Sequence, residues 1–279
     1  MHYKYTTSDD PGGITHPNRK LLDELHRACR APFAVREAAS VLGTDYGRTK
    51  WLLAYWTSHG WLSRIRRGLY VTVPLGAKNP SEWSEDPWIV AMRVFEPCYI
   101  GGWSACEHWN FTEQIFRGVV VFTSRKARHR ALQVKETPFV VKTVKPDFLF
   151  GTVAVWRAQV KVQVSDPSKT VADLLNHPDI GGGIRHIAQV LREYLDSKHR
   201  DETKLLEYIK RLDNKTIYKR LGFLLETFKS HESRLIDVCK DHLSAGYSIL
   251  DPTAKSNGSF NRRWGLRVNV SLNEELRNT

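Results

Sequence analysis

Residues 60–70 read GWLSRIRRGLY, and this stretch decides how the first part of the chain folds. Apolar and polar residues alternate on both sides of Arg66–Arg67–Gly68, which predicts two antiparallel strands joined by a tight turn. The turn and the strand before it carry three arginines within four positions, Arg64, Arg66 and Arg67. A positively charged hairpin of this kind suggests contact with an anionic partner.

Three short helical patterns precede this hairpin. The first covers residues 21–28 and the second covers residues 33–42, each with apolar residues at helical spacing. The third follows a capping residue, Thr44 or Asp45, and ends at Gly60. Three helices followed by a hairpin predict a winged helix-turn-helix over residues 18–74.

The predicted DNA contacts follow from the way such a domain docks. The second helix of the motif lies in the major groove with its N-terminal residues at the base edges, and the hairpin (the wing) lies beside the phosphates. A bidentate arginine is the commonest specific contact to a base. The predicted contact residues are Thr44, Tyr46, Gly47, Arg48, Thr49 and Lys50 on the third helix, with Arg64, Arg66 and Arg67 on the hairpin.

The distribution of charge agrees with this prediction. The 279 residues include 42 Lys or Arg and 30 Asp or Glu, for a formal net charge of +12. Residues 16–73 contain ten basic and four acidic side chains, so about a fifth of the chain carries half of the net charge. A basic surface that is merely solvated is the alternative interpretation.

A second, larger domain follows. Residues 75–87 are rich in turn-forming residues and are predicted to be a linker, and residues 1–17 are predicted to be a flexible arm. Residues 88–279 are predicted to form a mixed α/β domain with C-terminal helices and an extended tail, which makes the whole chain α+β. The predicted strands are 98–100, 118–123, 139–144, 148–152, 153–156, 160–164 and 265–270. The predicted helices are 88–95, 104–111, 167–175, 184–195, 202–212, 216–228 and 232–242.

Catalytic signatures are missing from the sequence. It has no phosphate-binding loop and no nucleophile elbow, and Cys106-Glu107-His108 is interpreted as part of the core. Nucleases place acids and a Glu-x-Lys pair on neighbouring strands, but here the one Glu-x-Lys match, Glu202–Lys204, begins a predicted helix. We therefore predict no enzyme activity, no catalytic or metal-binding residues and no cofactor. A DNA-binding nuclease and an RNA-binding protective module remain the alternatives.

Two aromatic clusters accompany the basic residues. Trp51, Tyr55 and Trp56 share the third helix, and Trp56 with one neighbour is predicted to pack beneath the wing rather than to stack on single-stranded nucleic acid. Near the C-terminus, Trp264 is predicted to be buried beside two solvated arginines.

The sequence also predicts the cellular setting. The four cysteines are widely spaced and form no Cys-x-x-Cys pair, which favours a reducing compartment. No stretch approaches the ~18 apolar residues of a membrane span, and the N-terminus lacks the apolar core of a signal peptide. We expect a cytoplasmic protein that does not associate with a membrane.

Several segments together resemble a known family. In order, they are GWLSRIRRGLYVTVP (60–74), YIGGWSACEHWNFTEQ (99–114), VVVFTS (119–124), VSDPSKTVADLLNHPDIGGG (164–183) and KRLGFLLE (219–226). Their sequence and order resemble the AbiEi antitoxins of type IV toxin–antitoxin systems, from Leu21 to about Phe228.

The resemblance implies a function for each domain. It implies that the N-terminal domain binds inverted repeats in the promoter of its own operon and represses transcription. It further implies that the second domain counteracts a nucleotidyltransferase-like AbiEii toxin, with no stable complex between the two proteins required.

Overall fold

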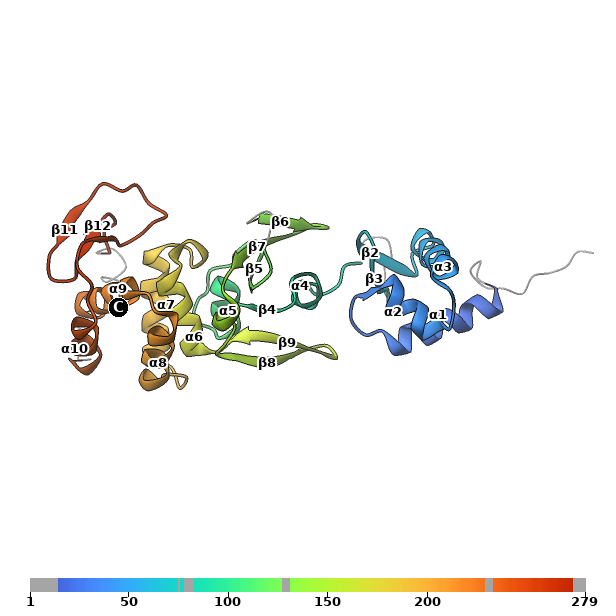
Figure 1. Ribbon diagram of the computed structural model, residues 1–279, viewed down its shortest axis with the longest axis horizontal. Coiled ribbons are helices and arrows are strands. Elements are labelled where there is room, and N and C mark those ends of the chain that lie inside the picture. The colour runs from blue at the N-terminus through green and yellow to red at the C-terminus, as the bar shows by residue number, and fades with distance from the viewer. Residues whose placement is uncertain (1–14, 75, 78–82, 127–130, 229–232, 273–279) are drawn as a thin grey trace, which may run out of the picture. The chain divides into compact units, whose positions relative to one another are not determined.

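The computed structural model describes residues 15–74, 76–77, 83–126, 131–228 and 233–272 (Figure 1). Helices and strands occur throughout, in separate α-rich and β-rich segments, and this confirms the predicted α+β class. The chain divides into two compact units. The first extends to Arg93 and includes residues 157–160, and the second contains Val94–Trp156 and the residues from Lys161 onward.

Among its described residues, the first unit holds three complete helices and a small sheet. Its antiparallel sheet has the order β1-β3-β2, and α3 contacts β2. The elements are α1 (His16–Ala28), β1 (Phe33–Ala34), α2 (Val35–Leu42), α3 (Tyr46–Ser58), β2 (Leu62–Arg66) and β3 (Leu69–Thr72).

Local chemistry explains where these elements begin and end. Gly43 stops α2 in the left-handed conformation at φ +60°, and Gly68 turns the hairpin at φ +78°, both of which favour glycine. Asp45 caps α3, since its Oδ1 accepts a hydrogen bond from the Arg48 N–H at 3.0 Å. Leu25, Leu53 and Trp56 are buried in the core that these helices share.

Two boundaries in this unit differ from the prediction. Residues 33–34 were expected to begin a helix, but they form β1 and pair with Tyr70 and Leu69 of β3. Helix α1 already begins at His16, inside the predicted arm of residues 1–17, because Pro17 fits the first turn of a helix. Residues 1–14 of that arm lie outside the described residues.

A six-stranded mixed sheet forms one layer of the second unit. Its order is β6-β7-β5-β4-β9-β8, with β5 parallel to β7 and β4 parallel to β9. All five residues of β5 are buried, which places this strand at the centre of the core. The strands are β4 (Cys98–Ile100), β5 (Val119–Thr123), β6 (Ala131–Val134), β7 (Thr137–Thr143), β8 (Thr152–Arg157) and β9 (Val160–Ser165).

Helices make up the other layer. Helix α6 lies between the large sheet and the remaining C-terminal helices, and its residues 168–175 are all buried (Figure 1). A small sheet of order β10-β12-β11 follows the helices. The helices of this unit are α5 (Gly102–His108), η1 (Pro146–Phe148), α6 (Pro167–Asn176), η2 (Pro178–Ile180), α7 (Ile184–Asp196), α8 (Glu202–Leu212), α9 (Lys215–Thr227) and α10 (Ser233–Asp241). Helix α4 (Pro87–Phe95) spans the boundary between the two units. The small strands are β10 (Ser248–Ile249), β11 (Ser259–Asn261) and β12 (Leu266–Val268).

The tail after α10 is tied to the helices by one tryptophan. Trp264 is fully buried, as predicted, and its Nε1 donates to Glu226 at 2.7 Å. Gly222 of α9 allows this approach, because a Cβ there would lie 2.0 Å from Cζ3 of Trp264. Arg263 pairs with the same Glu226 at 2.7 Å while remaining partly exposed.

Three further differences from the prediction concern the second unit. Residues 148–152 do not form a strand, because the chain makes the short helix η1 and β8 begins only at Thr152. The helix predicted over residues 104–111 begins two residues earlier as α5, and the Ser104 Oγ inside it accepts a hydrogen bond from the Val120 N–H at 3.1 Å. Strands β6, β10 and β11 were not predicted.

The boundary between the units also falls later than expected. Helix α4 begins at Pro87, and the division into compact units lies between Arg93 and Val94, whereas the sequence predicted a second domain from residue 88. Residues 75 and 78–82 of the predicted linker 75–87 lie outside the described residues.

Candidate nucleic-acid interface and a buried polar network

Helix α3 presents most of its predicted contact residues to solvent. Tyr46 is 55% exposed, and Gly47, Arg48 and Lys50 are also exposed. These residues occupy the first turn and a half of the helix, which is the part that meets base edges in a helix-turn-helix.

Thr49 does not belong to this surface, and its prediction as a DNA contact is wrong. Its side chain is fully buried, and its Oγ1 donates to the carbonyl of Asp45 at 2.8 Å. The same hydroxyl lies 2.7 Å from Oγ1 of Thr44, whose side chain is half-buried. Together these bonds hold the N-terminal turn of α3 in place, so both threonines support the surface from beneath.

Asp45 is the acidic residue at the start of this helix. The backbone hydrogen bond from Arg48 lowers the pKa of Asp45, so its carboxylate stays ionised and keeps capping α3 at neutral pH. Because the cap satisfies an N–H of the first turn, the exposed residues that follow are held on a well-formed helix.

The hairpin presents its three arginines. Arg64 and Arg66 point away from the core on either side of the buried Ile65, and Arg67 is exposed in the turn. A register shift in β2 between Arg64 and Arg66 marks a bulge, which bends the strand near its tip. Within the described part of the chain, no ion pair involves these three arginines, Arg48 or Lys50.

The aromatic residues of α3 separate into one buried and one exposed group. Trp56 is fully buried, as predicted. Trp51 is 60% exposed, and its ring stacks on that of Tyr55 with centroids 5.5 Å apart and planes only 9° from parallel. Tyr55 in turn contacts the ring of His59 at 4.2 Å.

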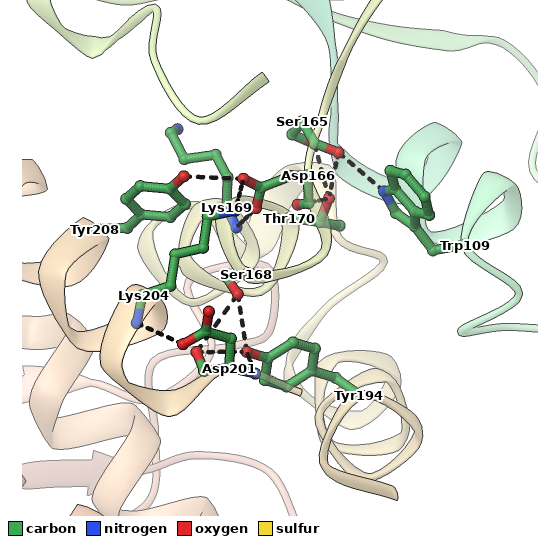
Figure 2. A network of polar contacts seen from close by, with 10 residues as sticks. All are labelled: Trp109, Ser165, Asp166, Ser168, Lys169, Thr170, Tyr194, Asp201, Lys204 and Tyr208. Carbon is green, nitrogen blue, oxygen red and sulfur yellow. Dashed lines mark hydrogen bonds and ion pairs between the residues drawn. The ribbon is translucent and has the colours of Figure 1, made fainter. Parts of the chain in front are cut away.

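A buried polar network surrounds the start of α6 in the second unit (Figure 2). Asp166 caps the helix, because its Oδ1 accepts a hydrogen bond from the Lys169 N–H at 2.9 Å. Its Oδ2 accepts from the Tyr208 hydroxyl at 2.9 Å and lies 3.0 Å from Nζ of Lys204. One carboxylate therefore connects α6 to two residues of α8.

Lys169 continues this network into the core. Its Nζ donates to the Tyr99 hydroxyl at 3.0 Å and forms an ion pair with Asp173, and the Tyr99 hydroxyl donates to the same carboxylate at 2.8 Å. The ammonium also lies 4.8 Å from the centre of the Phe150 ring. Burial raises the pKa of Asp173, while the adjacent Lys169 opposes that shift.

The other side of α6 is joined to α7 and to the loop before α8. The hydroxyls of Ser168 and Tyr194 lie 2.9 Å apart, and the Tyr194 hydroxyl donates to the carbonyl of Asp201 at 2.9 Å (Figure 2). Trp109 Nε1 donates to the carbonyl of Ser165, also at 2.9 Å. Each of these polar groups is satisfied within the protein, so the network connects elements of the fold.

The Glu-x-Lys match, Glu202–Lys204, belongs to this scaffold. Lys204 is paired with Asp166, and Glu202 is paired with Arg200, so both ends of Glu202–Lys204 are engaged at the start of a helix. Among the described residues, no group of three or more His, Cys, Asp or Glu side chains is placed to hold a metal ion.

Cys106 lies in the core, as predicted. It is fully buried, and burial raises the pKa of its thiol, which favours the protonated form over a reactive thiolate. The neighbouring Glu107 accepts a hydrogen bond from the Phe116 N–H at 3.1 Å.

None of the helices in the described residues has the length and apolar character that a membrane span requires.

Comparisons with known proteins address the fold alone. No protein-family model matches the chain, and no curated protein matches it either. The solved structure of the RV2827C protein from Mycobacterium tuberculosis is similar, with a TM-score of 0.61 and 13% sequence identity. The match covers 92% of this chain and 94% of that chain. At this identity, the likeness indicates a similar fold and nothing about activity.

Proposed function

We propose that the first unit is a winged helix-turn-helix that binds double-stranded DNA. In this proposal α3 enters the major groove with Tyr46, Gly47, Arg48 and Lys50 at the base edges. The β2–β3 hairpin is the wing, and Arg64, Arg66 and Arg67 neutralise phosphates. The observation that carries the proposal is the set of exposed cations on α3 and the hairpin, none of which joins an ion pair among the described residues.

The order of elements supports the same proposal. Helices α1, α2 and α3 precede β2 and β3, and the short β1 adds a third strand to the hairpin. Thr44, Thr49 and the Asp45 cap hold the start of α3 rigid, and a binding surface on a rigid element keeps its geometry when the partner arrives.

The resemblance to AbiEi antitoxins supplies the biological part of the proposal. The chain would repress its own operon by binding inverted repeats in the promoter, and its second unit would counteract a nucleotidyltransferase-like AbiEii toxin without a stable complex. It would act in the cytoplasm, without a cofactor and without enzyme activity of its own. The closed polar network around α6 supports a scaffold role for these residues rather than a reaction centre.

Footprinting on the DNA upstream of the gene tests the DNA-binding proposal. We expect protection of two inverted half-sites. In competition binding, we expect duplex promoter DNA to displace a bound DNA probe more effectively than structured RNA does. Preference for structured RNA would contradict this proposal and favour a protective RNA-binding module. Cleavage of plasmid DNA in the presence of Mg²⁺ would instead favour a nuclease. Rescue of growth against the toxin encoded by a neighbouring gene tests the antitoxin proposal separately.

A further inference from the structure

Trp51 occupies the centre of the solvent-facing side of α3. At 3.6 residues per turn, Gly47, Trp51, Ala54 and Ser58 fall along one line, and all four are exposed. That line lies opposite the buried side of the helix. The buried side consists of Thr49, Leu52, Leu53 and Trp56.

The neighbours of Trp51 leave its ring prominent. Gly47, one turn before it, has no side chain, and Ala54 after it has only a methyl group. The indole is nevertheless held in one orientation, since it stacks nearly parallel on Tyr55. A large apolar ring that is 60% exposed and already oriented is typical of an anchor residue at a binding surface.

The charges beside Trp51 identify the kind of partner. Arg48 and Lys50 are exposed on its two sides, so a partner that covers the indole must also accept two cations. Contact with a second copy of the same face would bring like charges together and is disfavoured. Duplex DNA offers guanine O6 and N7 acceptors for cations beside apolar thymine methyl groups on the floor of the major groove.

We propose that Trp51 is a specificity-determining residue that packs its indole against thymine 5-methyl groups in the major groove. The proposal rests on the DNA-binding function proposed above and adds a base preference to it. Because the centre of the exposed side of a groove-bound helix lies deepest in the groove, Trp51 is placed to read the base edges there. Arg48 and Lys50 then flank the indole and reach base edges on either side of it.

The test replaces single thymines by deoxyuridine, which removes only the methyl group. The probe is the duplex site obtained by footprinting, or by selection from a random duplex pool if the upstream region gives none. For the wild-type protein, we expect the affinity to fall about fourfold at one or two thymines in each half-site, as expected for the loss of one buried methyl group. Trp51→Ala should bind the thymine site more weakly and show no further loss at those positions.

Two variants serve as controls. Trp51→Phe keeps an apolar ring and should retain part of the thymine preference. Trp156→Ala removes a tryptophan that is similarly exposed, at 63%, on β8 and should leave both affinity and preference unchanged. Thermal unfolding of each variant checks that α3 remains folded.

The outcomes separate this inference from the proposed function. A flat response of the wild-type protein to deoxyuridine, or an unchanged thymine preference in Trp51→Ala, overturns the role of Trp51 while salt-dependent duplex binding still stands. If Trp51→Ala loses only its binding to single-stranded DNA, or loses only a dimer seen in sedimentation, the indole contacts another partner. Either result also overturns the role of Trp51 in thymine recognition. If no duplex binds at all, both proposals fail together.

Discussion

Lys169 and Asp173 form an ion pair one helical turn apart on α6, with side chains that are 0% and 2% exposed. The Tyr99 hydroxyl hydrogen-bonds to both partners and so connects the ion pair to β4. A pair removed from water in this way adds little net stability over an apolar replacement, but removing one partner leaves the other charge buried and unpaired.

We therefore expect Lys169→Met to destabilise the second unit by about 3–5 kcal/mol, measured by urea unfolding. Lys240→Met is the matched control, because Lys240 pairs with Asp237 on the surface and should cost no more than about 1 kcal/mol. Replacing all three polar partners, in Lys169→Met with Asp173→Leu and Tyr99→Phe, should recover much of the loss. Equal destabilisation by Lys169→Met and Lys240→Met would show that the buried pair has no special role.

The pH dependence of stability should depend on His177, the residue that ends α6. Burial, together with nearby Lys142, lowers the pKa of His177 to about 4 from its usual value of 6.5. Above pH 6.5 the ring is neutral in both the folded and the unfolded chain. Between pH 6.5 and about 4, the unfolded chain binds a proton that the folded chain does not, so stability falls as the pH falls.

His177→Gln should reduce this loss by an amount on the order of 3 kcal/mol at pH 4. The measurement is the free energy of unfolding of the wild-type and variant proteins from pH 8 to pH 4. Their difference should be constant above pH 7 and should shift in favour of the variant below pH 6.5. Parallel curves over the whole range would contradict the assignment. Burial also lowers the pKa of His186, so some acid sensitivity should remain in the variant.

Much of this architecture was predictable because local chemistry determines it. Asp45 is one of the two capping residues that the sequence offers for α3, and it accepts the expected backbone hydrogen bond from Arg48. The alternation around Arg66–Gly68 predicts the hairpin, and β4 and α8 have the predicted bounds. Each of these features depends on residues that are close in the sequence.

Two of the features that were missed depend on distant residues. Strand β1 has only two residues and exists through pairing with β3, more than 30 positions later. Lys169 can be buried because its ammonium donates a hydrogen bond to Tyr99, 70 positions earlier, and forms an ion pair with Asp173 in the core. A lysine spaced four residues before an aspartate in an apolar helix was the available signal. The burial of Thr49 was likewise accessible from helical spacing, since it shares a side with Leu52, Leu53 and Trp56.

The wing makes a prediction about salt dependence. Arg66→Ala combined with Arg67→Ala should weaken binding to all DNA sequences and flatten the slope of log affinity against log salt concentration by about one unit per lost phosphate contact. A fluorescence-anisotropy titration at several salt concentrations measures this slope. Arg27→Ala is the control, because Arg27 lies on α1 and pairs with Asp23 at 2.8 Å. An unchanged slope in the double variant would remove the hairpin from the interface.

Arg48 makes a different prediction, because a base contact affects discrimination rather than affinity for every sequence. Arg48→Ala should reduce the preference for operator over random DNA by about 1–3 kcal/mol, the range for a bidentate contact to guanine. Arg48→Lys is the sharpest comparison, since it keeps the charge but loses the two-pronged geometry. We expect it to bind random DNA as the wild-type protein does and to lose the operator preference as Arg48→Ala does. Competition binding with operator and random duplexes measures both quantities. If Arg48→Ala weakens binding to the two DNAs equally and Arg48→Lys restores both, then Arg48 contacts a phosphate, and the base edges are read by other residues of α3.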